Sequence, residues 1–188
     1  MELGSEIEVK LKPPRNLAGY PYHPNRFKDV VLIGCGTGIA PLYQMAHMIL
    51  ANRDETTNVW MVAAHRTEDD ILLREEFEQM ATFSERFKLH VALSQPVDRE
   101  AWEKECNSKS KPWSGSIGRL DLETLRTTLP AGDRASTMAV VCGLDGFLES
   151  VCGPHVRVKR PGTSKLKKTQ GPIVGFLGEL GFFQVVKL

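Results

Sequence analysis

The sequence lacks the features that mark several large classes of protein. None of its apolar runs approaches the roughly 20 residues that a membrane-spanning helix needs, and its first residues lack the basic-then-apolar layout of a secretory signal. Its charges nearly cancel, at 24 basic and 23 acidic residues, so nothing general favours binding to nucleic acid or contact with a membrane. What remains is typical of an ordinary globular domain, with 41% apolar residues in a chain of 188.

Cysteine is also scarce, and its placement is uninformative for metals. The sequence has four cysteines, none of them in a C-x-x-C pair. Because such pairs supply the ligands of most structural zinc sites, we predict no metal site. Scattered cysteines are typical of a reducing compartment. We therefore expect free thiols and an intracellular location, either cytoplasmic or on the cytoplasmic face of an organelle.

Strand-like and helix-like segments alternate along most of the chain. Short β-branched apolar runs predict five strands, at residues 29–34, 58–64, 87–93, 137–142 and 182–187. Helical periodicity and capping residues predict helices at residues 39–51, 71–83, 99–106, 120–129, 145–151 and 172–180. This alternation predicts an α/β fold, a doubly wound five-stranded parallel sheet flanked by helices, over residues 29–188.

Three alternating glycines, Gly34, Gly36 and Gly38, lie between the first predicted strand and the first predicted helix. Glycine lets the backbone approach a ligand closely, and a helix N-terminus favours a pyrophosphate. Open parallel sheets also bind ligands beyond the carboxyl ends of their strands. The spacing is neither G-x-G-x-x-G nor that of a Walker loop. Taken alone, the loop fits either a dinucleotide site or a tight turn without a ligand.

Three blocks, at the ends of successive predicted strands, resemble one family. Residues 36–41 resemble the G-T-G-I-[AT]-P segment of ferredoxin-reductase and cytochrome-b5-reductase nucleotide domains. Residues 66–74 resemble the family's Q-T-E-x-D-I-L-L-R segment, and residues 142–147 resemble its C-G-P-x-x-[MF] segment. The blocks occur in the family's order, although Cys35 stands where cytochrome-b5 reductases usually have glycine. The chain therefore resembles the nucleotide-binding domain of cytochrome-b5-reductase-like flavoproteins.

This resemblance implies an NAD(P)H-dependent oxidoreductase that passes electrons from NADH or NADPH through FAD to a haem-protein acceptor such as cytochrome b5. Cys142 would lie beside the nicotinamide and act by position and packing; the alternative is an inert buried thiol. The other implied cofactor-binding residues are Gly36, Thr37, Gly38, Ile39, Ala40 and Pro41 near the pyrophosphate, His65, Arg66 and Ser94 near the adenosine, and Gly143, Asp145, Gly146 and Phe147 along the dinucleotide.

The choice between the two dinucleotides depends on residues after the second and third predicted strands. Related cytochrome-b5 reductases commonly have an acidic residue near position 94, which repels the 2′-phosphate of NADPH. Here Ser94 takes that place and Arg66 stands nearby, a pair compatible with NADPH. The overall resemblance favours NADH.

The flavin-binding part of the family is missing from this sequence. The family holds FAD on an N-terminal barrel with an R-x-Y-[ST] motif, for which the sequence has neither the motif nor the length. Residues 1–28 resemble the end of that barrel, with a strand at 6–11, and the linker that leaves it. We therefore expect a separate FAD-binding barrel as partner. The alternatives are a nucleotide-binding remnant without turnover and a reductase component that serves an iron–sulfur partner.

A basic stretch interrupts the alternation. Residues 155–170 include six Lys and Arg, with no acidic residue between Glu149 and Glu179. Such a stretch is consistent with a solvated, mobile loop. It is also consistent with a docking surface for an acidic redox partner, because opposite charges speed encounter.

Overall fold

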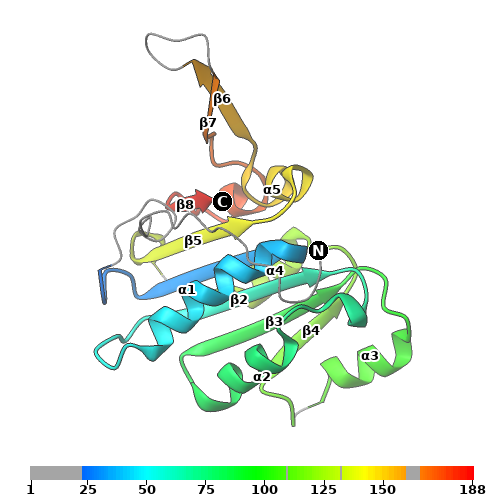
Figure 1. The fold of residues 1–188 in the computed structure, drawn as a ribbon. Coiled ribbons are helices and arrows are strands. Elements are labelled where there is room, and N and C mark those ends of the chain that lie inside the picture. Colours follow the sequence, from blue (N-terminus) through cyan, green and yellow to red (C-terminus); the bar gives the residue numbers. More distant parts are fainter. Residues whose placement is uncertain (1–22, 109, 132, 160–165) are drawn as a thin grey trace, which may run out of the picture.

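The centre of the molecule is a six-stranded parallel sheet with helices on both faces (Figure 1). The computed structural model describes residues 23–108, 110–131, 133–159 and 166–188. The strand predicted at residues 6–11 lies outside this part of the chain. The parallel strands are β1 (Asp29–Cys35), β2 (Asn58–His65), β3 (Phe87–Leu93), β4 (Trp113–Ile117), β5 (Thr137–Cys142) and β8 (Val185–Lys187).

The strand order, β4-β3-β2-β1-β5-β8, contains one reversal of direction. From β1 the chain moves outward through β2 and β3 to β4, and it then returns to pair β5 with the other side of β1. In doubly wound sheets such a reversal leaves a crevice beyond the carboxyl ends of the two central strands. The order therefore places the crevice between β1 and β5.

Helices divide between the two faces, and each face has its own apolar core. One core lies under the first three helices, which pack against the sheet through Leu42, Phe77 and Trp102. The other core lies under the last three helices, which pack through Leu125, Leu148 and Leu177. The helices are α1 (Ile39–Ala51), α2 (Arg74–Phe83), α3 (Arg99–Cys106), α4 (Leu122–Thr128), α5 (Asp145–Cys152) and α6 (Gly175–Glu179), with short 3-10 turns at Gly36–Gly38, Glu68–Asp70 and Arg134–Ser136.

The doubly wound α/β prediction is confirmed, but the sheet has six strands and not five. The missed strand is β4, which contains Gly115 between two serines and has little of the apolar run that marks a strand. Gly115 is required because the sulfur of Cys106, on α3, occupies the position of a side chain there. The indole Nε1 of Trp102, also on α3, donates to the Ser116 carbonyl at 3.2 Å. Packing against α3, and not local apolar pattern, thus places β4.

The predicted helix at residues 71–83 begins later than expected, at Arg74. Leu73 has a left-handed backbone, with φ of 56°, which interrupts the helical geometry before α2. Ile71 and Leu73 pack against the core while Leu72 is exposed. The three consecutive apolar residues therefore alternate between inside and outside, a pattern that helical periodicity alone does not resolve.

The basic stretch contains two strands that were not predicted. Residues His155–Lys159 (β6) and Leu166–Gln170 (β7) pair in antiparallel fashion as a separate two-stranded sheet. Figure 1 shows them projecting away from the parallel sheet on the side of β8. We call residues 155–159 and 166–170 the arm. The interpretation of the whole stretch as a loop is wrong for these residues.

His90 on β3 makes folding sensitive to acid. Its ring Nδ1 lies 2.9 Å from the Ser114 hydroxyl and its Nε2 lies 3.0 Å from the Ser116 hydroxyl. Burial lowers the pKa of His90 from 6.5 to about 4. As the pH falls below about 6.5, the unfolded chain therefore takes up a proton that the folded chain does not bind, and the free energy of unfolding decreases until about pH 4.

We expect urea denaturation to show a steeper loss of stability between about pH 6.5 and pH 4 for the natural chain than for H90Q. Parallel pH profiles for the two proteins would contradict this.

Candidate functional site

An open cleft of about 1000 Å³ lies at the carboxyl ends of the parallel strands. It is located where the reversal in strand order places a crevice. Residues at the carboxyl ends of five strands line it. They are residues 35–38 at the end of β1, 64–66 at the end of β2, Ser94 after β3, 118–120 after β4 and 142–144 at the end of β5.

Backbone packed against backbone forms the floor of the cleft between β1 and β5. A Cβ added to Gly38 would lie 2.5 Å from the Cys142 carbonyl oxygen and 3.0 Å from the Gly143 nitrogen. A Cβ added to Gly143 would lie 2.6 Å from the Cys35 sulfur. Because real Cβ atoms do not approach other atoms so closely, both positions require glycine. Gly38 is thus a packing residue whose missing side chain points toward β5 and not into open space.

Two helices begin at this floor. Gly38 is the N-cap of α1 and Leu144 is the N-cap of α5, and no side chain caps either helix. At α1 the Ile39 N–H already donates to the Gly36 carbonyl, and Pro41 has no N–H to offer. The positive ends of both helix dipoles favour a negatively charged group at this floor. Gly36 has a φ of 51° with open space around its Cα, so the loop presents bare backbone to the cleft. The floor has the chemistry of an anion site.

Two thiols lie beside the floor, and both are neutral. Burial raises the pKa of Cys35, and a hydrogen bond from the Leu144 backbone offsets only part of that rise. Burial also raises the pKa of Cys142, and the nearby Cys35 adds to the effect. A protonated thiol is a poor nucleophile. Cys142 therefore offers the cleft shape and polarisability, and not covalent chemistry.

A buried histidine marks the wall formed after β2. His65 is buried, and neither ring nitrogen has a hydrogen-bond partner among the described residues. Burial lowers the pKa of His65, and the nearby Asp70 offsets this only in part. The ring is therefore neutral near pH 7. A buried polar group without a partner is costly, so a polar ligand that reaches His65 would gain a bond that the protein alone does not provide.

Hydrogen bonds between neighbouring loops hold this wall in place. The backbone N–H of Ser94 donates to the His65 carbonyl at 3.0 Å, and that of Gln95 donates to the Arg66 carbonyl at 2.8 Å. The Arg66 Nε also donates to the Gln95 side-chain oxygen at 2.9 Å. The Glu68 carboxylate accepts a bond from the Val97 N–H at 2.8 Å, which keeps the pKa of Glu68 below its ordinary value. Arg66 and Ser94 are consequently brought to one end of the cleft.

The structure brings most of the predicted site residues together. Those that line the cleft are Gly36, Thr37, Gly38, His65, Arg66, Ser94, Cys142, Gly143, Gly146 and Phe147. Four predicted residues do not line it: Ile39, Ala40, Pro41 and Asp145. Ile39 is fully buried in the core under α1, so its side chain contributes to packing of the loop.

Sequence reasoning missed the part of the cleft contributed by β4. Gly118, Arg119 and Leu120 line the cleft directly after this strand, and the Gly118 N–H donates to the Leu93 carbonyl at 2.8 Å. Without β4 in the prediction, there was no strand end to which these residues could be assigned. Arg119 is the notable omission because it adds a second exposed guanidinium to the cleft. The sequence signal that could have indicated this strand end is Gly118, which directly follows Ser116 and Ile117.

Two further features are absent from the part of the chain that the structure describes. No group of three or more His, Cys, Asp and Glu side chains is arranged to hold a metal ion there. None of the helices found there is long and apolar enough to span a membrane.

Comparison with known proteins shows which family the chain resembles. Residues 32–153 match the family model of the oxidoreductase NAD-binding domain. NADH-cytochrome b5 reductase 2 of Botryotinia fuckeliana is 35% identical over 95% of this chain and 44% of its own length. The Aspergillus clavatus protein of the same name is 32% identical over 97% of this chain and 49% of its own. The chain thus spans about half the length of the curated relatives it matches.

A solved structure agrees with the fold as well. The cytochrome b5 reductase domain of Ulva prolifera nitrate reductase superimposes with a TM-score of 0.62 and 25% identity, covering 86% of this chain and 50% of that one. The resemblance drawn from the three sequence blocks is confirmed by these matches. The chain belongs to the oxidoreductase NAD-binding domain family.

Proposed function

We propose that this chain is the NADH-binding half of a flavin-dependent reductase that delivers electrons to a haem protein. The observation that carries the proposal is the cleft at the β1–β5 reversal, with two uncapped helix N-termini at its floor. The relatives named NADH-cytochrome b5 reductase extend the proposal to the acceptor. Because the chain matches about half of their length, we propose that an FAD-binding barrel forms the other half of the reductase.

The residues of the cleft suit a dinucleotide in three respects. Bare backbone at Gly36 and the start of α1 fit a pyrophosphate. Arg66 and Ser94, which the hydrogen-bonded loops hold in the cleft, fit the ribose end of an adenosine. The neutral thiol of Cys142 fits the face of an uncharged ring at the floor.

Hydride transfer between a bound nicotinamide and a flavin needs no acid, base or nucleophile from the protein. The task of this chain is to orient the dinucleotide and to keep it in one register. Gly36 leaves bare backbone open to the dinucleotide, and Cys142 holds the ring end in place. The hydrogen-bonded loops around Ser94 hold the opposite end.

We further propose a reducing compartment, cytoplasmic or on the cytoplasmic face of an organelle. The four cysteines are free thiols in the structure, which supports this location.

Gly146 provides a direct test of the cleft. It lines the cleft in the first turn of α5, and nothing lies within 4 Å of an added Cβ. We therefore expect G146L to fold normally while its side chain occupies the dinucleotide path. Isothermal titration calorimetry should show NADH binding weakened by about tenfold or more, which corresponds to ~1.4 kcal/mol. FAD alone should bind hardly at all to either protein.

The matched control is A51L, at an exposed position of α1 outside the cleft. It places the same leucine side chain on a helix and should leave NADH binding unchanged. Fused to the N-terminal part of the Botryotinia fuckeliana relative, the natural chain and A51L should support NADH-dependent cytochrome b5 reduction, and G146L should require more NADH. Equal NADH affinity in G146L and A51L would show that the cleft is not the dinucleotide site.

Cofactor choice has its own test at position 94. NADH remains the proposed cofactor, but Ser94 with Arg66 and Arg119 in the same cleft is compatible with the 2′-phosphate of NADPH. We expect S94D to weaken NADPH binding at least about tenfold more than NADH binding, through like-charge repulsion. S94N, which has nearly the same volume without the charge, is the control. If S94D weakens both cofactors equally, position 94 does not face the ribose phosphate.

A further inference from the structure

The arm is mounted on the central sheet by a buried lysine. Lys187 lies on β8, is 3% exposed, and donates from Nζ to the carbonyl oxygens of Pro154 at 3.0 Å, Gly171 at 3.3 Å and Pro172 at 2.8 Å. These three residues are the ones that enter and leave the arm. All three ammonium donors are therefore used to join its two ends to the sheet.

A second set of contacts fixes the same junction. The Gln170 side chain donates to the Lys187 carbonyl at 2.8 Å and accepts from the Lys187 N–H at 2.9 Å, as a further strand would. Gly153 enters the arm with a φ of 89°, and the Pro154 carbonyl occupies the place where Gly171 would carry a Cβ. Such a junction holds the arm in a defined direction.

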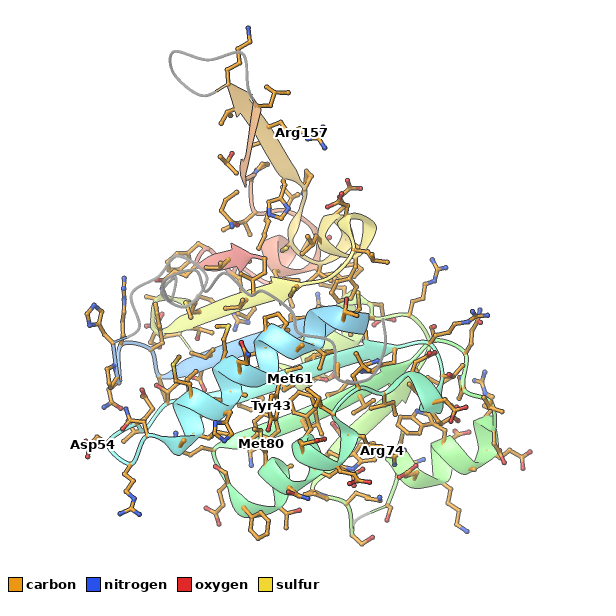
Figure 2. The ribbon with its side chains drawn as sticks, in the orientation of Figure 1. Tyr43, Asp54, Met61, Arg74, Met80 and Arg157 are labelled. Carbon is orange, nitrogen blue, oxygen red and sulfur yellow. The ribbon has the colours of Figure 1, made fainter. Side chains whose placement is uncertain are left out.

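The charge of the arm is unbalanced within the molecule. Arg157 and Lys159 are exposed, and neither forms an ion pair with any described residue. Figure 2 shows Arg157 on the arm, clear of the parallel sheet. The two strands of the arm pair from His155 opposite Gln170 to Lys159 opposite Leu166. Without the six basic residues of the 155–170 stretch, the chain would have 18 basic and 23 acidic residues.

We propose that the arm is a docking site for an acidic protein segment. The face of β6 that carries Arg157 and Lys159 would bind the carboxylates of this segment. Val156 and Val158, which are 37% and 46% exposed, lie on the opposite face of β6. This inference is independent of dinucleotide binding, because none of these residues lines the cleft.

The charge distribution selects an acidic protein over a membrane or a nucleic acid. Both of those are extended anionic surfaces, and they would also meet the rest of the chain, where acidic residues outnumber basic ones. A local acidic patch, the size of the arm, avoids that repulsion. The described part of the arm also contains no aromatic residue, whereas membrane-interface segments commonly use Trp or Phe as anchors.

Poly-L-glutamate is a suitable probe because it presents carboxylates without any fold of its own. We expect the natural chain to bind it with an affinity that falls as salt rises toward 0.15 M, where the Debye length is about 8 Å. R157E/K159E should lose about tenfold or more in affinity, and the neutral R157Q/K159Q should lose less. The control is R53E/K88E, which makes the same change in net charge at exposed positions away from the arm. It should stay within about twofold of the natural chain.

Further measurements decide whether the arm itself binds the acidic segment. Circular dichroism should show R157E/K159E folded, and its NADH affinity should equal that of the natural chain, which separates this proposal from that of the cleft. Equal losses in R157E/K159E and R53E/K88E would overturn the proposal, because net charge alone would then explain binding. Tighter binding of the natural chain to phosphatidylserine vesicles or to duplex DNA than to poly-L-glutamate would overturn it too.

Discussion

The contact of bare backbone between Gly38 and the Cys142–Gly143 peptide is the constraint on which the rest of the site depends. A side chain at Gly38 would press on the backbone of β5 and separate the ends of β1 and β5, and one at Gly143 would displace the side chains of Cys35 and Phe147. With none present, α1 and α5 begin side by side and run to opposite faces of the sheet. Their N-termini therefore converge on one point, and the strand ends on either side become the walls of one cleft. Gly38 is therefore needed for the packing of the two strands, and Gly36 leaves backbone open to a ligand.

The titratable groups that line the cleft near this contact point are kept neutral by burial. The thiols of Cys35 and Cys142 have raised pKa values, and the imidazole of His65 has a lowered one. Neither the thiols nor the imidazole is therefore activated as a nucleophile or a general base, although the carboxylates of Asp69 and Asp70 also line the cleft. The cleft suits chemistry carried entirely by bound cofactors, where the protein contributes geometry and exclusion of water.

Prediction from the sequence succeeded where local pattern and tertiary packing agree. The apolar runs of β1 and β5 and the stripe of α1 are buried as expected. It failed where a distant contact or a single backbone angle decides the structure. The strand around Gly115 packs against α3, and the left-handed backbone of Leu73 delays the start of α2. Arg119 was missed for the first reason, since its place in the cleft depends on β4.

The helix α5 connects the cleft to the arm. Its first turns line the cleft through Gly146 and Phe147, and its end leads through Cys152 into the arm. Leu148, Val151 and Cys152 are buried in the core between them, which anchors the helix along its length. Lys187, which anchors the arm, pairs on β8 with Val141, the residue before Cys142 at the end of β5. A partner docked on the arm would therefore be attached to a strand that meets β5 beside the floor of the cleft.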